Sequence, residues 1–266
     1  MSILSTKPKA ELLHTVLVYG PSKSGKTEAV GKLAELGYTL WWFDTEAGAL
    51  TLSKLSPAAQ GRINLYSIKD TAENSYAAKT LLKLLNYRNV GPKNLCTKHG
   101  NLECLECKKS GDSFEEFDIT KLGPKDVVVV DSLTQLSDSI LNSMLTSVEQ
   151  KPEYDHWRGL GVKLDSVMDW MKSASCHVVF ISHEQGIEME DGREKLTAVG
   201  GTKNYARSLP RHFSHVIYMS VVNKKHNAVS KSVALNGVVT GSRTDADVEK
   251  SEGNPLSAIF PKLATA

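Results

Sequence analysis

Residues 20–27, "GPSKSGKT", have the types and spacing that suit phosphate binding. They follow the apolar run "TVLVY" and precede a helical pattern, a context that separates a functional G-x4-G-K-[ST] match from a chance Gly-rich turn. The glycines let backbone N–H groups close around phosphate oxygens, and the start of a helix adds partial positive charge. We expect Lys26 to reach the β- and γ-phosphates and the Thr27 hydroxyl to bind Mg²⁺. The predicted nucleotide-binding residues are Gly20, Pro21, Ser22, Lys23, Ser24, Gly25, Lys26, Thr27 and Glu28.

Acidic residues end two apolar runs. Asp131 closes "VVVVD", and beside a phosphate site its carboxylate can hold Mg²⁺ through water, although an aspartate that ends a strand is common. Hydrolysis also needs a carboxylate that orients or deprotonates the attacking water. Ser132, not a glutamate, follows Asp131, so Glu46 at the end of "TLWWFDTE" is the predicted base, on a strand next to the phosphate loop. The alternative is a surface acid in a strand-to-helix turn.

A cysteine cluster offers a second kind of chemistry. Its spacing is C-x2-H-x4-C-x2-C, and two such pairs can place four N and S ligands around one tetrahedral ion such as zinc. Iron, a reducible thiol cluster and four unliganded side chains are the alternatives. Because the surrounding loop has no apolar core of its own, we expect a metal clip that holds its shape. The predicted ligands are Cys96, His99, Cys104 and Cys107.

The elements that must position these residues follow an alternating pattern. Short apolar runs alternate with amphipathic stretches, which predicts an α/β fold with a mostly parallel central sheet. The run 127–130 is apolar at every position, as in a central strand buried on both faces. Residues 89–125 lack a clear period and are predicted to form a zinc-binding insertion within a single domain spanning 1–266. Two further polar intervals, 149–161 and 184–201, interrupt the core.

The overall composition gives no net charge large enough to draw the protein to nucleic acid or to a membrane surface. There are 32 basic and 30 acidic residues, so any contact with nucleic acid must use local patches. No signal peptide and no apolar run long enough to span a membrane are found, so we expect a cytoplasmic protein with no membrane partner. In a reducing compartment, clustered cysteines are more often metal ligands or redox thiols than disulfides.

These motifs also carry a family resemblance. "WWFDTEAGAL" resembles the strand and catalytic glutamate of the RecA family, "VVVVDSLTQL" its second nucleotide motif, and "VVFISHEQG" its next strand. "VGGTKNYARSLPRHFSHVIYM" is similar to the segment that follows the family's second DNA-binding loop. The resemblance implies a RecA-like P-loop NTPase core of the compact kind found in bacteriophage single-strand annealing recombinases. It also implies that His183 senses the γ-phosphate, although RecA itself has glutamine there.

The resemblance gives the polar intervals a role in holding single-stranded DNA. An aromatic side chain beside a guanidinium, as in Trp157 and Arg158, suits base stacking with phosphate contact, whereas core packing of Trp157 is the alternative. The mixed charge of 185–201 supports DNA contact only weakly. The predicted DNA-binding residues are Tyr154, Trp157, Arg158, Arg193, Lys195 and Lys203.

Function and partners are expected to follow from this family. The expectation is a DNA-stimulated ATPase using ATP, Mg²⁺ and Zn²⁺, which binds single-stranded DNA and promotes annealing or recombination, encoded by a phage and acting in the host cytoplasm. Its expected partners are single-stranded DNA, further copies of the chain in a ring or filament, and a single-strand-binding protein. The alternatives are a nucleotide-switched loader acting on a protein partner and a zinc-finger DNA binder with a vestigial nucleotide site.

Overall fold

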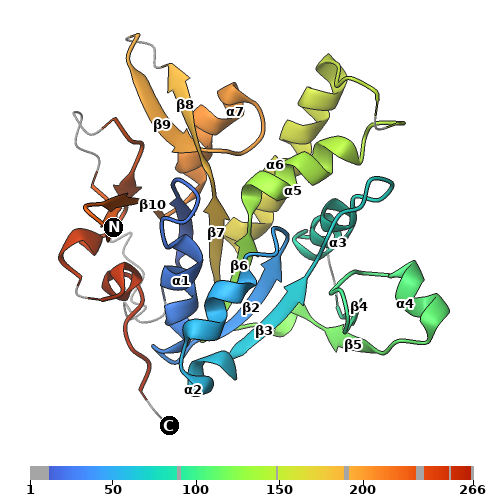
Figure 1. Cartoon of the computed structure of the whole chain (residues 1–266), viewed down its shortest axis with the longest axis horizontal. Helices are drawn as coiled ribbons and strands as arrows, with labels where there is room; N and C mark the ends of the chain where they lie inside the picture. The colour runs from blue at the N-terminus through green and yellow to red at the C-terminus, as the bar shows by residue number, and fades with distance from the viewer. Residues whose placement is uncertain are drawn as a thin grey trace, which may run out of the picture.

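A mostly parallel sheet forms the centre of the computed structural model, which describes residues 12–88, 91–147, 149–188, 192–231, 237–251 and 253–264 (Figure 1). Its strands are hydrogen-bonded in the order β11-β10-β1-β7-β6-β2-β3, and β12 pairs with β10. Only β11 and β12 run antiparallel to their neighbour β10, which confirms the predicted fold class. The strands are β1 Thr15–Tyr19, β2 Thr39–Asp44, β3 Ile63–Ser67, β6 Asp126–Asp131, β7 His177–Ser182, β10 His215–Val222, β11 Lys225–Val229 and β12 Gly241–Ser242.

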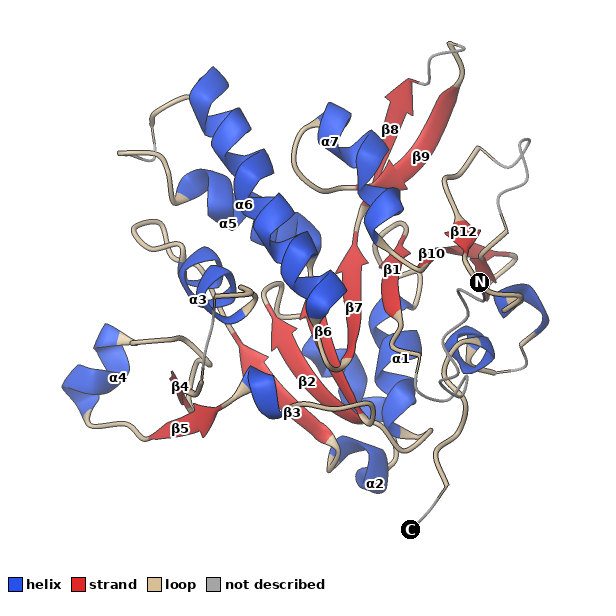
Figure 2. Cartoon of the chain, turned by 180° about the vertical axis from the view of Figure 1, so that it is seen from behind, coloured by secondary structure: helices blue, strands red, loops and turns tan. Residues whose placement is uncertain are grey.

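Helices cover both faces of this sheet (Figures 1 and 2). Leu81, Leu136 and Leu164, from α3, α5 and α6, belong to the core on one face, whereas Val30 of α1 belongs to the core on the other. The α-helices are α1 Lys26–Gly31, α2 Pro57–Gln60, α3 Tyr76–Leu84, α4 Leu105–Ser110, α5 Leu133–Asn142, α6 Tyr154–Ser173 and α7 Lys203–Ser208. The 3₁₀ turns are η2 Lys32–Ala34, η3 Ala49–Lys54, η4 Ile119–Lys121, η5 Leu209–His212, η6 Val248–Lys250 and η7 Pro255–Ala258.

Strand β6 shows why its sequence is apolar at successive positions. Val127 and Val129 belong to the core on the α1 face, whereas Val128 and Val130 belong to the core on the α5 and α6 face. All four side chains are fully buried, because successive residues of a strand point to opposite faces. The sheet is therefore packed on both faces beneath the residues at its carboxyl edge.

The cysteine-containing segment forms a small unit beside β3 (Figure 1). Strands β4 (Lys93–Cys96) and β5 (Phe114–Phe117) pair in an antiparallel ladder, with α4 between them in sequence. Gly100, at φ +67°, lies so close to Tyr66 of β3 that an added Cβ would be 2.6 Å from the Tyr66 Cβ. The segment thus packs tightly on the main sheet. The assignment of 89–125 as an insertion in one domain stays a prediction, and its first two residues lie outside the described ranges.

The two polar intervals are more regular than their composition indicated. Most of 149–161 belongs to the first two turns of α6, which starts at residue 154. The second interval is a hairpin of β8 (Glu184–Glu188) and β9 (Glu194–Ala198), whose connection at 189–191 lies outside the described residues. Polar composition therefore did not reveal these elements, because polar residues also occupy the exposed faces of helices and hairpins.

Among the described residues, no helix is both long enough and apolar enough to cross a membrane.

Candidate functional site

The phosphate loop connects β1 to α1 and has a shape that depends on two glycines. Gly25 caps α1 at φ 90°, a conformation that few other residues adopt without strain. An added Cβ at Gly20 would lie 2.0 Å from the Met219 carbonyl oxygen, so only glycine fits there. The Lys26 ammonium donates to the carbonyl oxygens of Gly20 (2.9 Å) and Pro21 (2.7 Å). These two hydrogen bonds therefore hold the start of the loop around the Lys26 ammonium.

The charge of Lys26 depends on nearby acids. Burial lowers the pKa of this ammonium, whereas the carboxylates of Asp131 and Glu46 act to raise it. The Lys26 side chain is only 7% exposed, and its two acceptors are neutral carbonyl oxygens. Phosphate oxygens carry more negative charge and would therefore replace these carbonyl oxygens as acceptors.

Thr27 and Asp131 meet across the sheet edge. The Thr27 hydroxyl donates to Oδ2 of Asp131 over 3.1 Å. Burial raises the pKa of Asp131 to about 7, with a further contribution from the Asp44 and Glu46 carboxylates. Hydroxyl and carboxylate oxygens are the ligands that Mg²⁺ prefers, so these two side chains fit a magnesium ion bound together with nucleotide phosphates.

Glu46 is held in a fixed orientation at the end of β2. Its Oε1 accepts a short hydrogen bond from the Ser132 hydroxyl, and its Oε2 lies 3.2 Å from Nε2 of His183. The Asp44 carboxylate fixes the turn by accepting from the Glu46 and Gly48 backbone N–H groups over 3.1 and 3.2 Å. A carboxylate oriented in this way can act on a water molecule beside the phosphate loop.

Lys26, Glu46 and Asp131 line one cavity of about 400 Å³. Although β2 contributes Glu46, it is not adjacent to the phosphate-loop strand, as the sequence interpretation had placed it. Both β7 and β6 lie between β1 and β2. Parallel strands end at the same edge, which is why the three strand ends still converge. The cavity is lined by Ser22, Lys23, Ser24, Gly25, Lys26, Thr27, Glu28, Glu46, Gly48, Thr51, Lys54, Asp131, His183 and His226.

Two residues beside the loop were missed from the sequence. His226 of β11 bonds to the Ser24 carbonyl through Nδ1 over 2.9 Å. Tyr19, immediately before the loop, donates its hydroxyl hydrogen toward the carbonyl oxygens of Val239 (2.7 Å) and Leu196 in β9 (3.1 Å). Neither residue belongs to a motif, so only the three-dimensional arrangement identifies them.

The four predicted metal ligands form a compact group. Their ligand atoms all lie within 4.8 Å of one another, and the three cysteines are buried. His99 Nδ1 lies 3.4 Å from Cys107 Sγ and 3.6 Å from Cys104 Sγ. Zinc–sulfur bonds of about 2.3 Å in a tetrahedron separate ligands by roughly 3.8 Å. The cluster therefore fits a structural zinc ion held by Cys96, His99, Cys104 and Cys107.

The residues predicted to bind DNA come from three elements beyond the carboxyl edge of the sheet (Figure 1). On α6, Tyr154 is 79% exposed and Trp157 is 39% exposed, so Trp157 is not a core residue. The first turns of α6, the β8–β9 hairpin and the start of α7 carry Tyr154, Trp157 and Arg158, then Arg193 and Lys195, and lastly Lys203.

One comparison with known proteins, the scan against family models, agrees with a nucleotide site. A family model described as "AAA domain" matches residues 14–244. Among similar solved structures is a prototypical ATPase from the type III secretion system of pathogenic bacteria, with 11% sequence identity and a TM-score of 0.45. That match covers 78% of this chain and 52% of the secretion ATPase chain, so this chain spans about half of its length. No curated protein matches. Since the family model spans most of the sequence, including the phosphate loop, Glu46, Asp131 and His183, the chain belongs to the AAA domain family of P-loop ATPases.

Proposed function

We propose that this ATPase binds single-stranded DNA in an ATP-dependent manner and promotes annealing or recombination, encoded by a phage and acting in the host cytoplasm. One observation carries the proposal. His183 contacts Glu46 at the nucleotide site, and the next residue begins β8 of the hairpin that bears Arg193 and Lys195. A change at the phosphates can thereby reach a candidate DNA surface directly.

The nucleotide would be handled by residues of the shared cavity. Lys26 and the loop N–H groups would bind the β- and γ-phosphates, and Thr27 and Asp131 would hold Mg²⁺. The Mg²⁺ would neutralise developing charge on the phosphates. Glu46, oriented by Ser132 and His183, would position or deprotonate the attacking water. DNA stimulation of turnover would follow if DNA on the hairpin stabilised this arrangement.

The DNA would contact α6 and the hairpin. Exposed Tyr154 and Trp157 could stack on bases while Arg158 contacts phosphates, with a contribution of about 1–3 kcal/mol for each stacked base. Other copies of the chain in a ring or filament, and a single-strand-binding protein, are the further partners of this proposal. Zinc held by the cysteine cluster would stabilise its own segment and would not contact the nucleotide.

The experiment is a titration of labelled single-stranded and double-stranded DNA with ATP or ADP, at two salt concentrations. Light scattering reads the assembly state in the same samples. We expect tighter binding to single strands with ATP and formation of larger assemblies. Absence of single-strand preference at both salts would contradict the proposal and favour a nucleotide-switched loader that acts on a protein partner.

Two variants on the first turns of α6 and one control variant locate the DNA surface. Trp157→Ala should weaken single-strand binding by about tenfold, because a stacked base loses its aromatic partner. Arg158→Ala should also weaken binding and reduce its salt dependence. Lys172→Ala removes a basic side chain at the other end of α6, where Lys172 pairs with Asp169, and should leave the affinity unchanged. Equal effects of Arg158→Ala and Lys172→Ala would exclude a specific surface on the first turns of α6.

A further inference from the structure

The edge hairpin β10–β11 supplies a side chain to the phosphate loop. His226, the second residue of β11, places Nδ1 2.9 Å from the carbonyl oxygen of Ser24. A carbonyl oxygen can only accept a hydrogen bond, so Nδ1 must carry the hydrogen. The contact joins residues 202 apart in sequence. Within the described part of the chain, the sheet pairs β11 only with β10.

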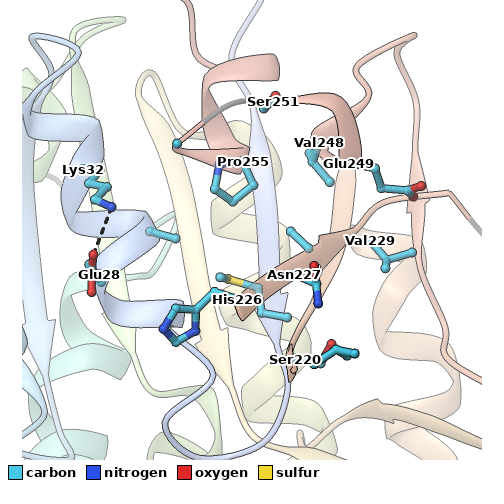
Figure 3. Close-up of a pocket in the computed structure, with 16 residues that line it drawn as sticks. Glu28, Lys32, Ser220, His226, Asn227, Val229, Val248, Glu249, Ser251 and Pro255 are labelled. Carbon is cyan, nitrogen blue, oxygen red and sulfur yellow. Dashed lines mark ion pairs between the residues drawn. The ribbon is translucent and has the colours of Figure 1, made fainter. Parts of the chain in front are cut away.

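The imidazole ring also fits the surface of the loop. A Cβ added at Gly25 would lie 2.9 Å from Nδ1 of His226 and 3.3 Å from its Cγ and Cε1. The ring therefore occupies the space that a side chain at position 25 would need. Figure 3 shows His226 pointing from β11 towards the first turn of α1, near the Glu28–Lys32 ion pair.

His226 stands where two cavities meet. The phosphate cavity and a neighbouring cavity of about 540 Å³, between α1 and β10–β11, share Gly25, Glu28 and His226. A nucleotide whose phosphates bind at Gly25 would therefore lie close to this side chain. Two kinds of effect are therefore conceivable, one on the loop itself and one on the nucleoside end of the ligand.

The hydrogen-bond geometry favours an effect on the loop. In a trans peptide the C=O and N–H groups point in opposite directions, so fixing the Ser24 carbonyl towards β11 directs the Gly25 N–H away from β11. The Gly20 and Pro21 carbonyls are held by Lys26, but the Ser24 carbonyl is held from outside the loop. A peptide group whose orientation is fixed before binding does not have to reorient when phosphate binds.

We propose that His226 is a positioning residue of the phosphate loop, which fixes the Ser24–Gly25 peptide from the edge hairpin and so increases affinity for the phosphates. The inference rests on the proposed nucleotide site. The relevant ligand chemistry is a di- or triphosphate, whatever base it carries.

The test compares ADP with inorganic tripolyphosphate, each measured by calorimetry on His226→Leu and His226→Asn. The Leu variant should weaken both ligands by the same factor, about five- to tenfold, since one hydrogen bond is lost. The Asn side-chain amide places an N–H donor near the position of Nδ1, so this variant should remain within about twofold of wild type. In turnover assays, the Leu variant should raise KM for ATP more than it lowers kcat.

Three results would overturn the proposal. Unchanged affinity of the Leu variant for both ligands would show that the contact does not position the loop. Weaker binding of ADP with unchanged tripolyphosphate affinity would mean that the ring contacts the nucleoside. An Asn variant as weak as the Leu variant would exclude the hydrogen bond as the cause. Lys26→Ala separates the two levels of inference, because retained tripolyphosphate affinity in that variant would refute the nucleotide site itself.

Discussion

Nε2 of His183 lies 3.2 Å from Oε2 of Glu46, so the ends of β7 and β2 are joined at the nucleotide site. The His183 carbonyl accepts a hydrogen bond from the Val199 N–H over 2.8 Å, just after β9. His183 thus contacts the predicted base with its side chain and the hairpin with its backbone. These two contacts of His183 link the nucleotide site to the hairpin that carries part of the candidate DNA surface.

His183 should therefore affect coupling more than folding. His183→Gln keeps a donor for Glu46 and should retain most of the ATP-dependent gain in single-strand affinity. His183→Ala removes the donor, and we expect it to lose most of that gain and to slow ATP turnover by about tenfold. Equilibrium DNA binding with and without ATP measures the difference. Equal behaviour of the two variants would show that the contact with Glu46 carries no signal.

Asp131 should make magnesium binding depend on pH. Burial raises its pKa to about 7, so the nucleotide-free carboxyl gains a proton as the pH falls through neutrality. Because Mg²⁺ requires the carboxylate, the Mg²⁺ concentration for half-maximal ADP binding should be about five- to tenfold higher at about pH 6 than at about pH 8.

The same raised pKa of Asp131 also affects folding. The folded protein keeps this proton at a pH where the unfolded chain has lost it, so the contribution of Asp131 to folding stability falls as the pH rises from about 4 towards 7.

Asp131→Asn is the control for that pH dependence. The amide cannot ionise, so Mg²⁺ should bind more weakly at every pH. Only the dependence from the nucleotide's own phosphates should then remain. A pH profile identical to that of the wild type would rule out Asp131 as the titrating ligand.

The metal cluster should support its own segment and leave the nucleotide site intact. The double variant Cys104→Ser and Cys107→Ser should lose its bound zinc, measured by elemental analysis, and residues 93–117 should exchange amide hydrogens faster. Its affinity for ADP should stay within about twofold of wild type. Cys176→Ser is the matched control, because Cys176 is a buried thiol outside the cluster and should not affect the zinc content. Loss of ADP binding in the double variant would show that the clip also stabilises the main sheet.

Much of the nucleotide site could be predicted because its residues lie at the ends of buried strands. Asp131 and Glu46 each follow an apolar run, and parallel strands bring such ends to one edge. An apolar run does not indicate which strands will be its neighbours in the sheet. The prediction that β2 lies next to the strand of the phosphate loop, β1, was therefore wrong. His226 could not be found at all, because its role depends on a contact across 202 residues and on no motif.

The extent of α6 shows a different limit. Its buried positions begin at Leu160, so the apolar period that reveals a helix is missing from the first turns. Those turns project beyond the core, and their exposed residues resemble a loop in composition. The metal ligands were easier to predict, since four residues within a short segment need few long-range contacts to meet.

ATP turnover by Glu46→Gln is the measurement that tests the central claim most directly. Glutamine keeps the size and hydrogen-bonding reach of the side chain but cannot accept a proton, so turnover should fall by about 100-fold or more while ADP affinity stays unchanged. Lys26→Ala should lose both nucleotide binding and turnover. If Glu46→Gln hydrolysed ATP at the wild-type rate while Lys26→Ala was inactive, Glu46 would not be the base, and the account of this site would be contradicted.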